Sequence, residues 1–174
     1  MPKLYQCAFE PTGGPTKIQN AFYDAFKKRY MSAPAVKTKP MLAVRETLIT
    51  AKGAAFAMGV CTNKSEPVAE TILNELQLMS FFTDYVGSMP GRALKPDPEP
   101  LLLCAERIGT GERQAVLVGD SIADVKAARN AGMPCILVRG GYTNAAPELL
   151  GADVVIDSFD HLFDALEKLA ACAC

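Results

Sequence analysis

The chain has 174 residues, and its 18 Lys and Arg against 19 Asp and Glu give a formal net charge of −1. Hydrophobic residues make up 49% and charged residues 21%, as in an ordinary globular domain with a sizeable core. No basic stripe indicates nucleic acid, no apolar stretch reaches the roughly 20 residues of a membrane span, and no signal-peptide pattern is present. Cys61 and Cys135 lie within apolar runs and favour a reduced, cytoplasmic protein.

The first forty residues are less regular than the rest. Lys3–Phe9 is predicted to form a strand and is followed by a Gly/Pro turn at Pro11–Pro15. The spacing of apolar residues predicts a helix over Ile18–Tyr30. Met31–Pro40 is then expected to be a linker.

From residue 41 onward, strands are predicted to alternate with helices. A helix ends at Gly53, a buried strand over Ala54–Cys61 closes at Thr62 and Asn63, and Ser65 caps the next helix. The later predicted elements are a strand at Tyr85–Gly87, a helix from Asp97 to Ile108, a strand at Ala115–Val118, a helix with Ile122, Val125 and Ala128 on its buried face, strands at Pro134–Val138 and Asp153–Ile156, and a helix over Phe159–Ala170. This order predicts an α/β fold with a parallel sheet flanked by helices.

Two carboxylates follow the apolar run that ends at Gly119. Asp120 and Asp124 lie four residues apart where this strand passes into a helix. Ligands of open α/β sheets bind at the carboxyl ends of the strands, and two acids placed there favour a cation such as Mg²⁺. The alternative is that Asp120 and Ser121 cap the helix while Asp124 is solvated on its first turn.

Two further groups are expected at the same edge of the sheet. Thr62 and Asn63 end a strand, where a hydroxyl and backbone N–H groups can hold a phosphate oxygen. Lys95 lies in a proline-stiffened loop before a helix and can neutralise a phosphoryl group as a point charge. The alternatives are a helix entry at Thr62 and a surface position for Lys95.

These motifs together resemble the haloacid dehalogenase (HAD) superfamily of phosphatases. Val60–Lys64 is similar to the second motif of that superfamily, Lys95–Pro98 to the third, and Gly119–Asp124 to the fourth. With Arg129–Gly132, the surrounding sequence looks most like phosphoglycolate phosphatases, over about residues 20–168.

The resemblance implies a HAD-type Rossmann-like fold and Mg²⁺-dependent phosphoryl transfer through an aspartyl-phosphate, which water then hydrolyses. By position, Asp120 is implied to be a metal ligand and Asp124 a second ligand or an outer-shell acid. Thr62 and Asn63 are implied to hold the phosphate, and Lys95 to stabilise the charge on the transferred group.

The chain departs from the family at the first motif, which carries the nucleophilic aspartate and an acid/base aspartate two residues later. The sequence has no such Asp-x-Asp, and Phe9–Gly13 reads Phe-Glu-Pro-Thr-Gly. In that alignment Glu10 takes the nucleophile position and Thr12 the acid/base position. The extra methylene of glutamate moves the carboxylate by about 1 Å, and such a misplacement can cost about 100-fold in rate.

The resemblance also implies a domain map. Residues 1–15 correspond to a degenerate first strand and motif, residues 16–40 to a remnant of the helical cap and a linker, and residues 41–174 to the core domain. We expect Lys3–Phe9 to fill the central strand position, failing which the fold is strained or completed by another chain. A truncated cap leaves apolar surface, so a homodimer is an open alternative.

Three functions compete at this point. The first is a Mg²⁺-dependent phosphatase acting on a small phosphorylated metabolite such as 2-phosphoglycolate. The second is an impaired or inactive homologue that still binds Mg²⁺ and phosphate. The third, a receiver domain, requires acids at the end of the first strand and an acceptor aspartate in mid-chain, and neither is evident.

Overall fold

The computed structural model describes residues 16–111, 114–141 and 146–172. The chain forms two compact units, Met1–Thr38 and Lys39–Cys174. The described part of the first unit contains helix α2 (Thr16–Ser32), which confirms the helix predicted over Ile18–Tyr30. The strand predicted over Lys3–Phe9 lies outside the described residues.

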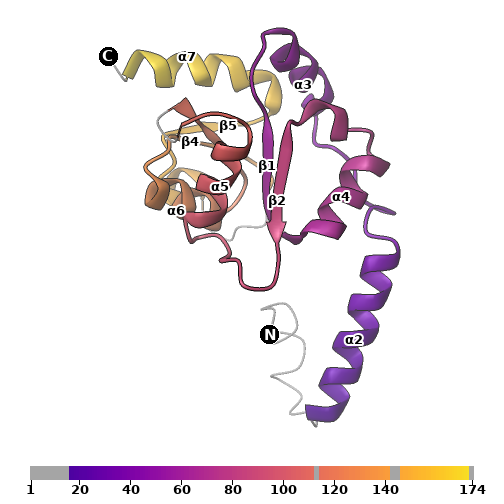
Figure 1. The fold of residues 1–174 in the computed structure, drawn as a ribbon. Coiled ribbons are helices and arrows are strands. Elements are labelled where there is room, and N and C mark those ends of the chain that lie inside the picture. Colours follow the sequence, from indigo (N-terminus) through magenta and orange to yellow (C-terminus); the bar gives the residue numbers. More distant parts are fainter. Residues whose placement is uncertain (1–15, 112–113, 142–145, 173–174) are drawn as a thin grey trace. The chain divides into compact units, whose positions relative to one another are not determined.

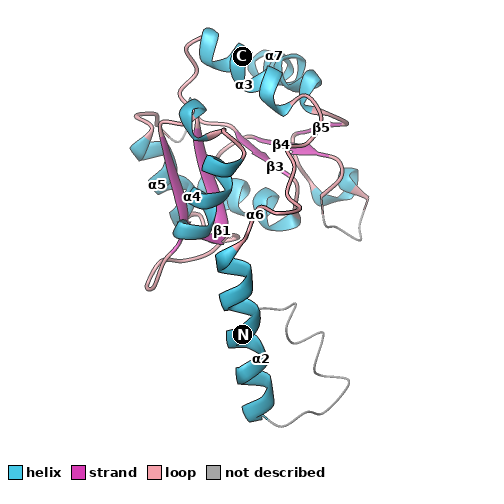
Figure 2. Cartoon of the chain, turned by 90° about the vertical axis from the view of Figure 1, so that its right-hand side faces the viewer, coloured by secondary structure: helices cyan, strands magenta, loops and turns pink. Residues whose placement is uncertain are grey.

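The second unit alternates helices and strands as predicted (Figure 1, Figure 2). Its elements in order are α3 (Val44–Gly53), β1 (Gly59–Ser65), α4 (Glu66–Glu75), η2 (Met79–Phe81), β2 (Asp84–Ser88), α5 (Glu99–Arg107), β3 (Leu117–Gly119), α6 (Ile122–Ala131), β4 (Cys135–Val138), η4 (Pro147–Leu150), β5 (Val154–Ile156), η5 (Phe159–His161) and α7 (Leu162–Cys172). Every strand pair among the described residues is parallel, which confirms the predicted parallel architecture flanked by helices. No helix in the described ranges is both long and apolar enough to cross a membrane.

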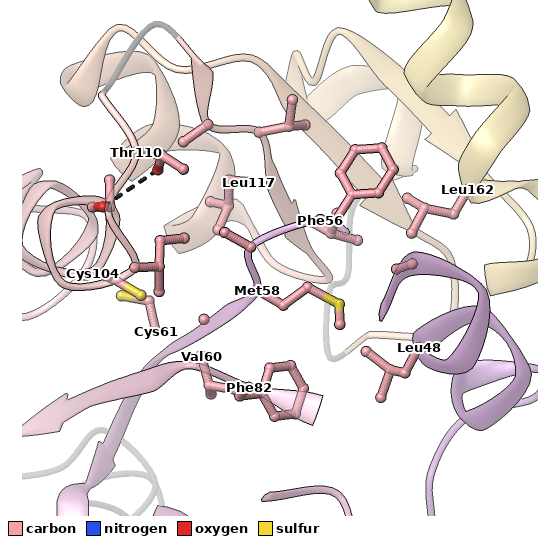
Figure 3. Close-up of a pocket in the computed structure, with 18 of the residues that line it drawn as sticks. Leu48, Phe56, Met58, Val60, Cys61, Phe82, Cys104, Thr110, Leu117 and Leu162 are labelled. Atoms are coloured by element: carbon pink, nitrogen blue, oxygen red, sulfur yellow. Dashed lines mark hydrogen bonds between the residues drawn. The ribbon is translucent and has the colours of Figure 1, made fainter. Parts of the chain in front are cut away.

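The strands form two sheets, β1-β2 and β3-β4-β5. Within the described ranges, β1 pairs only with β2, and β3 pairs only with β4. A cavity of about 430 Å³ with a mainly apolar lining is walled by both strands, with Val60 and Cys61 from β1 and Leu117 and Val118 from β3 (Figure 3). Within the described residues, β1 and β3 therefore each have one edge that pairs with no other strand. Both strands line the apolar cavity, whereas a parallel sheet usually continues from one strand to the next.

Strand β4 forms the centre of the core because its side chains alternate between two buried faces. Cys135 and Leu137 pack with residues of α5 and α6, whereas Ile136 and Val138 pack with α7 and β5. All four side chains are buried, as the two-residue period of a strand requires when helices cover both faces. The continuous apolar run at Pro134–Val138 therefore reflects burial on both sides.

Strand β1 begins later than the sequence predicts. The buried strand predicted over Ala54–Cys61 is present but misplaced, because β1 spans Gly59–Ser65, and its residues are half-buried or exposed rather than buried. The N–H groups of residues 54–56 instead donate to carbonyls of α3 at 2.9–3.1 Å and end that helix. Ala55 adopts a left-handed φ of 61° there, a conformation that closes a helix rather than starts a strand. Thr62 and Asn63 thus lie within β1.

We expect Ile136→Ala to destabilise the protein strongly, because Ile136 is fully buried and its truncation leaves a cavity. Ile-to-Ala changes in cores cost about 2–5 kcal/mol of unfolding free energy. Ile49→Ala is the matched control, since Ile49 is 56% exposed on α3. Its effect should stay within about 0.5 kcal/mol. Urea unfolding followed by circular dichroism measures both, and equal effects would contradict the core described above.

Candidate active site

The ammonium group of Lys95 is the centre of the candidate site. Its Nζ donates to the carbonyl oxygen of Cys61 on β1 at 2.7 Å. It also lies 2.7 Å from Oδ1 of Asp124 on α6. The side chains of Lys95 and Asp124 are only 10% and 7% exposed, so each charge depends on the other for compensation. The alternative of a surface lysine is therefore wrong.

Asp124 is held by the start of its own helix. Its Oδ2 accepts from the hydroxyl of Ser121 at 2.6 Å and from the N–H groups of Ser121 and Asp120 at 3.0 and 3.2 Å. The Ser121 hydroxyl in turn accepts from the N–H of Asp124, which completes a capping box. The capping alternative is thus correct for Ser121, but Asp124 is buried rather than solvated.

The two aspartates are shifted in opposite directions. Burial tends to raise the pKa of Asp124, but the Lys95 ammonium and hydrogen bonds from Lys95 and Ser121 outweigh burial and hold that pKa below its ordinary value. For Asp120, burial first and the negative charge of Asp124 second raise the pKa above its ordinary value, against the opposing effect of Lys95. Asp120 is thus an acid whose ionised form lacks full compensation from the described side chains.

A divalent cation suits this pair of acids. The donor set is hard carboxylate oxygen, and the pKa of Asp120 is raised first by burial and second by the negative charge of Asp124, which a cation would offset. Both oxygens of Asp124 already accept from Lys95 or the helix start, so Asp120 is the more available ligand. Across residues 16–111, 114–141 and 146–172, no three His, Cys, Asp or Glu side chains cluster as a complete metal site.

Asn63 contacts the backbone of Lys95 with both atoms of its amide. Its Nδ2 donates to the Lys95 carbonyl, and its Oδ1 accepts from the Lys95 N–H, both at 2.9 Å. The hydroxyl of neighbouring Thr62 accepts from the N–H of Lys64 at 3.2 Å and can still donate to a ligand. The structure therefore brings Asn63 together with Lys95, Asp120 and Asp124, and Thr62 is the neighbouring residue of β1.

The thiol of Cys61 is not an activated nucleophile. Burial raises its pKa above the ordinary value, and the nearby Lys95 ammonium only partly opposes that effect. Thiols react as thiolates, so a raised pKa leaves this group inert at neutral pH. Cys61 contributes its carbonyl oxygen to the site, and its side chain lines the apolar cavity.

Glu10 and Thr12, which the sequence places at the nucleophile and acid/base positions, lie outside the described residues. Two other groups were not predicted from sequence. Asn130 on α6 donates from Nδ2 to the carbonyl of Pro96 at 2.9 Å, and Arg92 pairs with Glu66. These contacts join residues 34 and 26 positions apart, so no local pattern could reveal them.

Gly119 leaves the space that Asp124 occupies. A Cβ added at Gly119 would lie 2.5 Å from Cβ and 2.7 Å from Cγ of Asp124, closer than real Cβ contacts. We expect Gly119→Ala to lower the unfolding free energy by about 1–3 kcal/mol, as overpacking does. Gly53→Ala is the control, because nothing lies within 4 Å of an added Cβ there. Equal urea midpoints for the two variants would contradict this packing.

Comparison with known proteins identifies the family. The model of the haloacid dehalogenase-like hydrolase family matches residues 7–138. A phosphoglycolate phosphatase of Caulobacter vibrioides is 35% identical over 158 residues, which are 90% of this chain and 67% of that protein. An N-acetylmuramic acid 6-phosphate phosphatase of Pseudomonas aeruginosa is 34% identical over 151 residues, which are 86% of this chain and 66% of that protein.

Solved structures agree with the sequence relatives on the fold. The crystal structure of a predicted phosphoglycolate phosphatase from Haemophilus somnus matches with a TM-score of 0.82 at 24% identity. The match covers 88% of this chain and 68% of that one. The resemblance stated from the motifs is therefore confirmed, and the chain belongs to the haloacid dehalogenase-like hydrolase family.

Proposed function

We propose that this chain is a Mg²⁺-dependent phosphatase that acts on a small phosphorylated metabolite such as 2-phosphoglycolate. The observation that carries the proposal is the buried Lys95 ammonium, held between Asp124 and the Cys61 carbonyl of β1. A fixed cation can offset the charge of a phosphate, and an adjacent pair of acids can bind a metal ion at the same place. The names of the two relatives, both phosphatases of small phosphorylated compounds, support the same class of substrate.

In this proposal Thr62 and Lys95 contact the phosphate, and Asn63 supports them. The hydroxyl of Thr62 donates to one phosphate oxygen, and Asn63 holds the adjacent part of β1 and the Lys95 loop in place. The ammonium of Lys95 offsets the charge that grows on the transferred group. Because Lys95 is already positioned, little reorganisation is needed when substrate binds.

Asp120 and Asp124 are the proposed metal-binding residues. Asp120 would bind Mg²⁺ directly, whereas Asp124, whose oxygens are engaged with Lys95 and Ser121, would act as a second or outer-shell ligand. When bound, Mg²⁺ supplies positive charge that polarises the phosphoryl group. Without a metal ion, Asp124 still holds the Lys95 ammonium in place through their ion pair.

The nucleophile is assigned to the N-terminal segment. We propose residues 1–15 as the first strand and motif, residues 16–40 as a cap remnant with a linker, and residues 41–174 as the core. The Glu10 carboxylate would attack phosphorus and expel the substrate alkoxide, and Thr12 would position water for the hydrolysis that follows. Threonine is a weak general acid at neutral pH, so slow turnover is expected.

The alternative is an impaired homologue that still binds Mg²⁺ and phosphate. The feature that favours it is the absence of Asp-x-Asp from the sequence.

Cytoplasmic residence is supported by the free, buried thiols of Cys104 and Cys135, whose pKa burial raises to about 12. The homodimer stays a prediction.

The first test is phosphate release from 2-phosphoglycolate and from an aryl phosphate in the presence of Mg²⁺. We expect slow turnover that Glu10→Ala abolishes and that Glu10→Asp/Thr12→Asp raises by about 100-fold, the factor associated with a 1 Å misplacement. Glu106→Ala, on the exposed face of α5, is the matched control and should behave as the parent.

The outcomes separate the alternatives. An inactive parent with activity gained in the double variant identifies an impaired site on an intact scaffold. An active parent that Glu10→Ala leaves unchanged contradicts the assignment of Glu10. If neither the parent nor the double variant releases phosphate from either compound, the phosphatase proposal fails.

The second test is Mg²⁺ binding by titration calorimetry. Asp120→Asn should weaken binding by more than the roughly 10- to 100-fold that loss of an outer-shell partner costs, because it removes a direct ligand. Asp164→Asn, at an exposed position in the first turn of α7, makes the same change away from the site and should bind as the parent does. Unchanged affinity in Asp120→Asn would reject the metal assignment.

A further inference from the structure

The Lys95–Pro96 segment is held by its backbone as well as by the Lys95 side chain. Asn63 binds the N–H and the carbonyl of Lys95, and Asn130 binds the carbonyl of Pro96, all at 2.9 Å. Three hydrogen bonds from two distant side chains therefore fix two consecutive residues. Such a dense set of contacts is unusual for a loop, whose backbone groups ordinarily bind water.

These contacts come in matched pairs from two elements. Strand β1 supplies the Cys61 carbonyl to the ammonium and the Asn63 amide to the backbone. Helix α6 supplies the Asp124 carboxylate to the ammonium and the Asn130 amide to the backbone. Asp124 and Asn130 are six residues apart, so they act from the two ends of α6, about 9 Å apart along its axis.

The backbone contacts matter because a lysine side chain is long and flexible. Its ammonium has three N–H donors, and in the described part of the chain Cys61 and Asp124 use two of them. The third donor can reach a phosphate oxygen only if the Lys95 backbone keeps its position, because the same ammonium must also reach Cys61 and Asp124. A shift of about 1 Å at a reacting group can cost about 100-fold in rate.

We propose that Asn63 and Asn130 are positioning residues that hold the Lys95–Pro96 backbone and thereby set where the Lys95 ammonium meets the phosphate. This inference rests on the proposed phosphatase function for its effect on turnover. It assigns the side chain of Asn63 an action through Lys95 rather than on the phosphate itself. It also gives a functional role to Asn130, which lies on the far end of α6 from the two acids.

The experiment uses the full chain with Asn63→Ala, Asn130→Ala and Asn130→Asp. Both asparagines are exposed, so these changes leave the core intact. Asn74→Ala and Asn74→Asp, at an exposed position on α4, make the same changes elsewhere. The first readout is the acylation rate of each lysine with an amine-reactive ester, measured by mass spectrometry after digestion.

In the parent, Lys95 should react slowly because it is buried and paired, whereas exposed Lys64 reacts fast. Each Asn63 or Asn130 variant should raise the Lys95 rate by at least about threefold to tenfold, the range that loss of one typical hydrogen bond allows, since Asn130 makes one such bond to the segment and Asn63 makes two. The Lys64 rate and the circular dichroism spectrum should not change. The Asn74 variants should match the parent throughout.

The second readout is the kinetics of phosphate release. Both Asn63→Ala and Asn130→Ala should lower kcat by about tenfold with a smaller change in KM, since Lys95 acts mainly on charge developed during transfer. A raised KM in Asn63→Ala with an unchanged Lys95 labelling rate would show a direct phosphate contact and overturn the proposal. Unchanged Lys95 labelling in every folded Asn63 and Asn130 variant would overturn it as well.

The two proposals fail separately. If the parent releases no phosphate, the labelling rates still decide whether Asn63 and Asn130 hold Lys95. If the parent is inactive but the variants raise the Lys95 labelling rate as expected, the positioning contacts are supported while the phosphatase function fails. If activity is present but labelling does not respond, only the positioning role is rejected.

Discussion

The buried ion pair between Lys95 and Asp124 is the interaction on which the site depends. A charge removed from water is tolerated only when a partner and hydrogen bonds compensate it, and here each side chain provides that compensation for the other. The pair also joins elements from separate sheets, because Lys95 contacts β1 through Cys61 while Asp124 starts the helix that follows β3. Removing either side chain would leave the other as an uncompensated buried charge, and it would also break the connection between these elements.

The helix start explains why two neighbouring acids differ. Asp124 completes the capping box of α6 and accepts from the Lys95 ammonium, so its ionised form is stabilised. Asp120 lies just outside that helix, half-buried beside a carboxylate that is already charged, so burial and that negative charge raise its pKa. At this helix start, Asp124 is thus paired with Lys95, whereas the neighbouring Asp120 favours a bound cation. This asymmetry is the basis for proposing Asp120 as the direct metal ligand.

The division of the strands into two sheets is the second constraint. Parallel sheets are normally buried on both faces with paired interior strands. In the described residues, β1 and β3 instead both line one apolar cavity, and β1 is only half-buried. The loop carrying Lys95 contacts β1 through Asn63 and contacts α6, which follows β3, through Asn130.

The sequence by itself determined the order of helices and strands, the parallel architecture and the approach of Asn63, Lys95 and Asp120 to one another, because these follow from apolar periodicity and local motifs. It misplaced the start of β1, since the helix-ending conformation at Ala55 is decided by the fit of α3 rather than by local propensity. Only the tertiary structure decided that Asp124 is buried against Lys95 and that Asn130 binds Pro96. Contacts between residues tens of positions apart depend on how elements pack, and a single sequence carries no local signal for them.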